Sequence, residues 1–347
     1  MNRTIRVLIV DGSPSMRRLV AHALRTDSSI VIVGEAGDVP SARQAIKDLS
    51  PDVVTLDVEM PGMNGLDFLE KIMRLRPMPV VMVSTLTSRG AEATIRALEL
   101  GAVDCVAKPS TDDPNSLDCL PRKVRCAAAS SVRSAMSAHP PKAVERVHYV
   151  PSDDIVAIGG STGGVEAALA VLSAFPANGP ATLLTLHLPA PFTGSFVGRL
   201  GSLCRMRVEQ AADGAPIEPG CIYVAPGTVA HLEVAGGSRP RCRLVQGPAI
   251  NGHRPSVDAL FGSIARVRGP RAVGAILTGM GRDGAQGLLA MRQAGAQTFG
   301  QDEASCVVFG MPRAANEVGA VGELVPLSRM ADRLLTAASA VTAGAQT

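Results

Sequence analysis

The sequence predicts an α/β protein of two domains, each built around a largely parallel β-sheet, and three observations support this. The chain has 347 residues, which is long for one domain because domains usually hold about 100 to 200 residues. Short apolar runs alternate with helical stretches in both halves, a pattern typical of parallel sheets. Between the halves, residues 126–154 read CAAASSVRSAMSAHPPKAVERVHYVPSDD, and this Ala-, Ser- and Pro-rich composition indicates a linker.

The first domain is expected at residues 1–122, with a five-stranded parallel sheet. Its apolar runs include residues 5–10, 52–58, 79–84 and 102–108, and its helical stretches include residues 15–25, 65–75 and 94–100. We place the linker at residues 123–153, with some helical character at its start, and the second domain at residues 154–345. Strand signals in the second domain lie at residues 155–160, 181–188, 221–226, 272–279 and 296–301.

The composition argues against several other classes of protein. A net charge of +3, no Trp and two Tyr are a weak basis for binding nucleic acid. The basic cluster at residues 199–210 is interpreted as a solvated helix face. Seven cysteines without a C-x-x-C pair argue against disulfides and zinc. No long apolar run and no signal peptide is found, so we expect a cytoplasmic protein without membrane insertion.

Four polar residues follow or end apolar runs of the first domain: Asp11, Asp57, Ser84 and Lys108. Ligands of open parallel sheets bind at the carboxyl ends of the strands, so we expect these side chains to converge. Carboxylates there would hold Mg²⁺ and accept a phosphoryl group on Asp57, while the hydroxyl and the ammonium would bind phosphate oxygens. Taken singly, Asp11 has the alternative of a helix cap and Lys108 that of a solvated side chain.

With LDVEMPGMNGLDFLEKI at residues 56–72, this constellation resembles the response-regulator receiver domain over residues 1–122. The resemblance implies a flavodoxin-like fold and phosphorylation of Asp57 by a chemotaxis histidine kinase. Two positions depart from the family pattern. Gly12 stands where a second acid is usual, so one Mg²⁺ ligand is missing or replaced by water, leaving Asp11 and Asp57. Cys105 stands where an aromatic switch residue is usual.

In the second domain, DIVAIGGSTGGVEAA at residues 154–168 predicts a strand, a tight turn and a helix. Such a turn suits either a phosphate or a nucleophile, but it lacks the lysine of a P-loop, and the next strand ends in His187 rather than a ribose-binding acid. We therefore favour Ser161 as a nucleophile with His187 as its base, and Asp283 as the carboxylate that orients the imidazole. Helix-capping roles for Ser161 and Asp283, and a core role for His187, remain open at this point.

The order Ser, His, Asp matches none of the familiar hydrolase orders. Together, IGGSTGG, HLPAPFTGSFVGRL, ILTGMGRDGAQGL and QDEASCVVFGMPRAA resemble the catalytic domain of chemotaxis protein-glutamate methylesterases, over residues 154–345. The resemblance implies a Rossmann-like, mostly parallel α/β domain that hydrolyses glutamate methyl esters on methyl-accepting chemotaxis receptors and deamidates certain glutamines. It assigns catalysis to Ser161, His187 and Asp283, without a cofactor.

The same resemblance places Thr162 and Met280 beside the active site, and Met280 would help to shape the oxyanion region. Backbone N–H groups after Ser161 and in the turn 279–281 are candidate oxyanion donors. In the family, the receiver covers the esterase cleft until it is phosphorylated. One alternative keeps the chemistry but assigns it to a chemosensory pathway other than motility, with a degenerate switch. His253 and Arg254 are either substrate-facing or surface residues, and residues 305–315 are either cleft wall or core.

Overall fold

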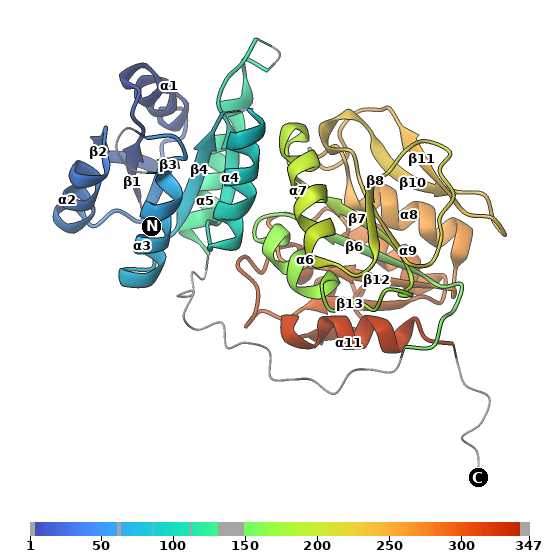
Figure 1. The fold of residues 1–347 in the computed structure, drawn as a ribbon. Helices are drawn as coiled ribbons and strands as arrows, with labels where there is room; N and C mark the ends of the chain where they lie inside the picture. The colour runs from blue at the N-terminus through green and yellow to red at the C-terminus, as the bar shows by residue number, and fades with distance from the viewer. Residues whose placement is uncertain (1–3, 61–63, 86, 112, 131–148, 341–347) are drawn as a thin grey trace. The chain divides into compact units, whose positions relative to one another are not determined.

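A computed structural model describes residues 4–60, 64–85, 87–111, 113–130 and 149–340. The chain divides into two compact units, Met1–Pro140 and Pro141–Thr347, and Figure 1 traces both. Most of the expected linker, including His139 and His148, lies outside the described residues.

The first unit contains a five-stranded sheet in the order β2-β1-β3-β4-β5, with every pair parallel, as predicted. Strand β1 lies between β2 and β3, so the strand order reverses there and opens a crevice at the carboxyl ends of β1 and β3. The strands are β1 Ile5–Val10, β2 Ile30–Ala36, β3 Val53–Asp57, β4 Val80–Ser84 and β5 Asp104–Ala107. The helices are α1 Pro14–Arg25, α2 Val39–Leu49, α3 Gly65–Leu75, α4 Ser88–Glu99 and α5 Leu120–Ala128, with the short 3₁₀ helix η1 at Ser116–Cys119.

Helix α5 crosses the boundary expected at residue 122. Val124, Cys126 and Ala127 are buried, and the helix contacts β3, β4 and β5 as well as α1. The start of the expected linker is therefore the last helix of the first unit, because its small apolar residues supply one face of an amphipathic helix.

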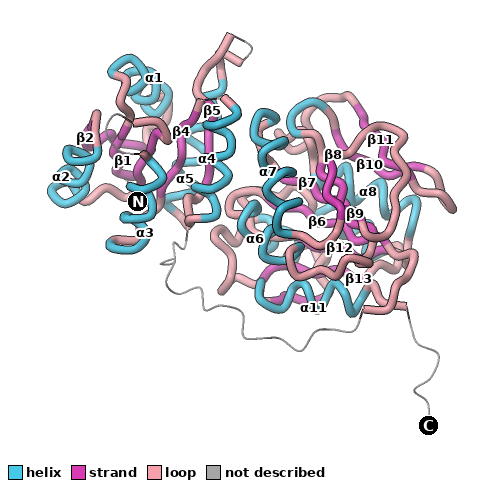
Figure 2. The backbone as a smooth tube through the Cα atoms, in the orientation of Figure 1, coloured by secondary structure: helices cyan, strands magenta, loops and turns pink. Residues whose placement is uncertain are grey.

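The second unit is a seven-stranded parallel sheet in the order β14-β13-β12-β6-β7-β9-β8, with a separate antiparallel hairpin, β10-β11 (Figure 2). Its central strands β6, β7 and β12 are buried along their whole length, as expected for a sheet covered on both faces. The strands are β6 Ile155–Gly160, β7 Ala181–Leu186, β8 Arg207–Gln210, β9 Cys221–Val224, β10 His231–Ala235, β11 Arg241–Val245, β12 Ala272–Ile276, β13 Gln297–Gln301 and β14 Glu323–Val325. The helices are α6 Gly164–Leu172, α7 Ala190–Leu203, α8 Val257–Arg268, α9 Ala285–Gln293, α10 Met311–Glu317 and α11 Leu327–Ala337, with η3 at Gly227–Val229.

The basic segment 199–210 is not a single helix face, so that interpretation was wrong. Helix α7 ends at Leu203, and Arg207–Gln210 forms the edge strand β8, paired in parallel with β9. The strand is short and mostly polar because it lies at the edge of the sheet, where one side faces solvent. That composition is what made it look like a solvated helix.

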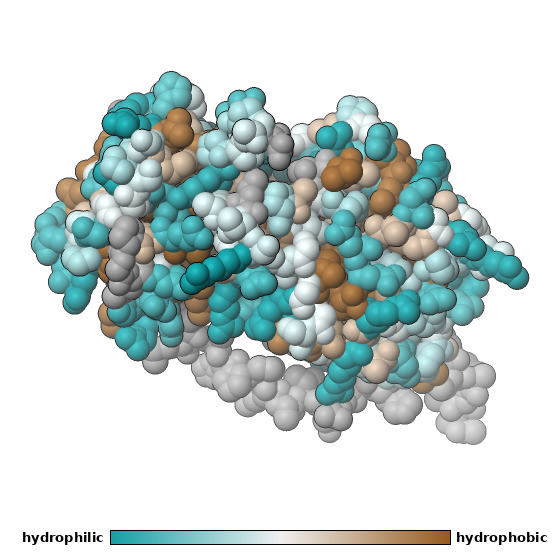
Figure 3. Space-filling model, turned by 45° about the horizontal axis from the view of Figure 1, so that its top comes forward, coloured by the Kyte–Doolittle hydropathy of each residue, from teal (hydrophilic) through white to brown (hydrophobic). Residues whose placement is uncertain are grey.

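No helix in the described part of the chain is long and apolar enough to span a bilayer. On the face drawn in Figure 3, hydrophilic residues cover much of the surface and hydrophobic residues lie in scattered patches.

Candidate active site

The turn after β6 presents Ser161 at the carboxyl end of the sheet. Its backbone N–H donates to Thr278 O at 3.0 Å, and its carbonyl accepts from Gly164 N at 2.7 Å. The N-cap of α6 is Gly163, with φ of 76°, and no side chain caps this helix. The turn needs glycine at 163 because that φ is left-handed and because a Cβ would lie 2.7 Å from the Val307 side chain. Ser161 is therefore not a helix cap, and it is half-buried at the turn.

His187 follows the neighbouring strand β7 and pairs with Asp283. Its Nε2 lies 2.8 Å from Asp283 Oδ2, and the two side chains are only 5% and 1% exposed. The other ring nitrogen, Nδ1, is buried and has no hydrogen-bond partner among the described residues. His187 is therefore not simply a core histidine with both nitrogens hydrogen-bonded. Its Nε2 is held by Asp283, and its Nδ1 can accept a proton.

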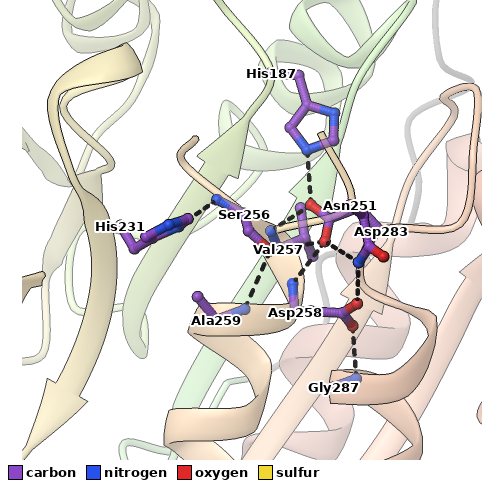
Figure 4. Close-up of polar contacts among 9 residues, drawn as sticks. All are labelled: His187, His231, Asn251, Ser256, Val257, Asp258, Ala259, Asp283 and Gly287. Atoms are coloured by element: carbon purple, nitrogen blue, oxygen red, sulfur yellow. Dashed lines mark hydrogen bonds and ion pairs between the residues drawn. The ribbon is translucent and has the colours of Figure 1, made fainter. Parts of the chain in front are cut away.

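The Asp283 side chain contacts the N-terminal end of α8. It does not cap α9, whose N-cap is Gly284. Asp283 Oδ2 accepts from Val257 N at 2.7 Å, and Oδ1 accepts from Ser256 Oγ at 2.7 Å and from Asp258 N at 3.3 Å (Figure 4). Helix N-termini stabilise negative charge through these free N–H groups. Burial by itself would raise the pKa of Asp283, but the hydrogen bonds from His187, Ser256 and Val257 hold the pKa well below its usual value.

His231 and Asn251 also support this arrangement, and Asn251 could not be identified from the spacing of the motifs. Ser256 N donates to His231 Nδ1 at 3.1 Å, and His231 Nε2 lies 3.0 Å from Pro248 O. These contacts place the His231 proton on Nε2 and tie this buried residue to Ser256 at the start of α8. Asn251, which was not predicted, donates to Asp283 Oδ1 at 3.2 Å.

The segment 305–315 supplies both cleft wall and core. Val307–Gly310 are half-buried beside the Ser161 turn, whereas Met311 and Ala315 are fully buried. Thr278 joins the segment to the turn, because its Oγ1 donates to Thr162 O at 3.0 Å and accepts from Val308 N at 3.0 Å.

The oxyanion donors are fewer than the sequence suggested. The N–H of Gly279 donates to Val308 O at 3.1 Å, and that of Gly164 donates to Ser161 O, so both are already used. In the turn 279–281 this leaves the N–H groups of Met280 and Gly281. Met280 is half-buried there, and Thr162 is buried next to Ser161.

The loop before α8 also places His253 against His187. The two rings are stacked, with centroids 3.6 Å apart and planes inclined by 2°. The sequence left His253 open between substrate-facing and surface positions, and the structure places it against the candidate base.

In the first unit, Lys108 bridges the two predicted carboxylates. Its Nζ lies 2.9 Å from Asp11 Oδ2 and 2.7 Å from Asp57 Oδ2, and all three side chains are largely buried. Lys108 is therefore not simply solvated, and Asp11 is not the cap of α1, which is Ser13. Burial raises the pKa of Asp57, although the neighbouring Lys108 opposes that change. The pKa of Lys108 is raised by the two carboxylates in spite of burial.

Three other positions of this pocket, Ser84, Gly12 and Cys105, do not contribute a side chain to the carboxylates in this structure. The Ser84 hydroxyl donates to Gly90 O at 3.2 Å, so it is directed at α4 in this arrangement and not at the carboxylates. Gly12 offers no side chain, and no three or more His, Cys, Asp or Glu side chains in the described ranges come together to hold a metal ion. Cys105 is buried, and burial raises the pKa of its thiol to about 12.

Comparison with known proteins covers both units. The sequence model of the family described as CheB methylesterase matches residues 156–334, and that of the response regulator receiver domain matches residues 7–117. A protein-glutamate methylesterase/protein-glutamine glutaminase from Caulobacter vibrioides is 60% identical over 97% of this chain and 98% of its own. One of the same name from Escherichia coli is 50% identical over 97% of each chain. The Thermotoga maritima CheB methylesterase catalytic domain superposes with a TM-score of 0.52 at 32% identity, covering 54% of this chain and 99% of its own. The chain belongs to the CheB methylesterase family, with a response regulator receiver domain in front of the methylesterase domain.

Proposed function

We propose that this protein hydrolyses glutamate methyl esters on methyl-accepting chemotaxis receptors and converts certain receptor glutamines to glutamate. The observation that carries the proposal is the buried His187–Asp283 pair, with Nδ1 of His187 unpartnered. It lies at the strand end next to the one that carries Ser161. Relatives named protein-glutamate methylesterase/protein-glutamine glutaminase match nearly the whole chain, which favours this pathway over another chemosensory one.

In the proposed mechanism, Ser161 attacks the carbonyl carbon of the ester or amide. Because Asp283 holds Nε2 of His187, the serine proton moves to Nδ1, and Asp283 stabilises the imidazolium that forms. The proton on Nδ1 then goes to the leaving methanol or ammonia, and an acyl-enzyme on Ser161 remains. Water attacks this acyl-enzyme by the same proton path, which releases glutamate and restores the serine.

The oxyanion formed in both steps needs hydrogen-bond donors. The N–H groups of Met280 and Gly281 are proposed for this role, together with a backbone N–H of the turn after Ser161 other than that of Gly164. One such donor contributes roughly 10²–10³ in rate. Esters and amides pass through the same tetrahedral intermediate, so one site serves both reactions.

We further propose that Asp57 accepts a phosphoryl group from a chemotaxis histidine kinase. Asp11 and Asp57 are the carboxylates that fit Mg²⁺, which usually keeps several waters and needs one or two protein carboxylates. Water would take the place that Gly12 leaves empty, and the bound ion would neutralise charge on the transferred group. Lys108, already paired with Asp57, is suited to bind a phosphate oxygen once the carboxylate is modified.

Phosphorylation would then control the esterase. It adds about −1.5 to −2 units of charge at Asp57, and couplings between sites are typically about 1–3 kcal/mol. A coupling of that size shifts the equilibrium between two states of the protein by roughly 5- to 150-fold.

The test measures methanol release from membranes that carry methylated receptors, with the full chain, Mg²⁺ and a small-molecule phosphodonor. Release by the native protein, with none by Ser161→Ala, is expected. Release that rises with the phosphodonor, and does not rise for Asp57→Asn, would support the control step. No release from methylated receptors under either condition would refute the substrate assignment.

A further inference from the structure

The segment Ile250–Asp258 contacts both members of the His187–Asp283 pair. Asn251, Ser256 and Val257 donate to the Asp283 carboxylate, and the ring of His253 lies flat on the ring of His187. One short stretch of chain therefore holds the carboxylate from one side and the imidazole from another.

The backbone of this segment is built in a way that fixes the position of residue 253. Ile250 N donates to His253 O at 3.0 Å, and His253 N donates to Ile250 O at 2.9 Å. Between them, Asn251 and Gly252 have φ of 52° and 79°, the left-handed pair that closes a two-residue turn. Asn251 is held in turn by Asp258 Oδ2 at 2.7 Å. The turn is thus anchored to α8, and His253 is presented from a rigid frame.

A single hydrogen bond does not fix the plane of an imidazole. The bond from Nε2 to Asp283 allows the ring of His187 to rotate about the line joining the two atoms, and such rotation would swing Nδ1 away from the nucleophile. A second ring stacked with its centroid 3.6 Å away and its plane inclined by 2° restricts that rotation. The two faces are at van der Waals contact distance, so turning the His187 ring would drive its edge into the ring of His253.

We infer that His253 is a positioning residue for the base: it keeps the His187 ring in the plane in which Nδ1 can take the proton of Ser161. This inference rests on the proposed function, in which His187 acts through Nδ1. His253 itself takes no proton in the reaction. The role requires a flat ring at position 253 and does not require a second imidazole.

The test compares His253→Leu with His253→Phe in the full-length protein, because only the second keeps an aromatic ring. Gln246→Leu, at an exposed position four residues before this segment, is the control for adding leucine. Methanol release gives kcat and KM, and a fluorophosphonate probe gives the rate of covalent modification of Ser161 without a receptor. Active-site titration with that probe counts the folded enzyme, so loss of folding is separated from loss of rate.

For His253→Leu we expect kcat to fall about 3- to 10-fold, the range that aromatic pairing supports, with KM unchanged. The fluorophosphonate rate should fall by the same factor, while His253→Phe and Gln246→Leu should stay near the native values. Equal losses in the Leu and Phe variants would overturn the inference, as would a change confined to KM, which would make His253 a substrate contact. If Ser161→Ala is inactive but His253→Leu is fully active, this inference alone fails. If Ser161→Ala releases methanol, the proposed function fails first.

Discussion

Replacing Asp283 by asparagine separates the two tasks of this carboxylate, which are accepting hydrogen bonds and setting the tautomer of His187. The carboxylate accepts from His187 and Val257 on Oδ2, and from Asn251, Ser256 and Asp258 on Oδ1. An amide has only one acceptor oxygen, so one of the two groups of donors must face an NH₂.

The amide NH₂ fits best at the Oδ2 position. Of the two donors there, only the N–H of Val257 would lose its acceptor without being able to change its own protonation. His187 can respond by moving its proton to Nδ1 and accepting at Nε2. One buried donor without an acceptor costs about 1–3 kcal/mol, which is the expected loss in the free energy of unfolding. The tautomer shift blocks proton transfer from Ser161, so kcat should fall by on the order of 10⁴, as loss of the orienting carboxylate does in other triads.

The pH dependence of stability gives a second measure of the same change. Since the folded-state pKa of Asp283 is lowered, its charge contributes stability that is present above the unfolded pKa of about 3.9 and is lost as pH falls through the folded value. The difference in unfolding free energy between native protein and Asp283→Asn should therefore be largest above about pH 5 and shrink below about pH 4. Urea unfolding at several pH values and steady-state methanol release measure both effects. A variant with kcat within tenfold of native would refute the reasoning.

Three further changes test other parts of the molecule. Ser161→Ala should abolish methanol release and leave the unfolding free energy within about 0.5 kcal/mol, and release from this variant would exclude the nucleophile assignment. Thr278→Val removes the hydroxyl that joins Thr162 O and Val308 N, so urea unfolding should show a loss of about 1–3 kcal/mol, and an unchanged stability would contradict that role. Gly12→Asp adds a carboxylate beside the receiver pocket and should tighten Mg²⁺ binding by about tenfold. Titration with Mg²⁺ and the Mg²⁺ dependence of phosphorylation measure this change. Unaltered binding would show that water already replaces the missing ligand fully.

The sequence was sufficient to predict the central strands and the residues at their ends. Buried parallel strands are continuous apolar runs, and their carboxyl ends share one edge, so Ser161, His187 and Asp283 could be expected near one another. The receiver carboxylates and Lys108 followed from the same argument. The short strands β8, β14 and the β10-β11 hairpin were missed because three to five partly polar residues have no distinctive period.

The support of the Asp283 carboxylate could not be predicted from motif spacing, because its donors lie 25 to 32 residues away in sequence. A signal was nevertheless present. Asn251-Gly252 is a turn pair, and Ser256 is the N-cap of α8, whose hydroxyl accepts from Ala259 N. A capped helix start is a site for negative charge, and Asp283 is the carboxylate that the fold brings to it.

This arrangement has a consequence for control of the enzyme. The described partners of the His187–Asp283 pair, namely Asn251, His253, Ser256, Val257 and Asp258, all belong to the second unit. Among the described residues, the contacts that hold the pair in place therefore come from the second unit itself. A phosphoryl group on Asp57 has two remaining ways to change the rate: it can alter access to Ser161, or it can alter the loops that hold His187. The first would change the reaction with a receptor but leave the rate with a small fluorophosphonate nearly constant, whereas the second would change both rates together.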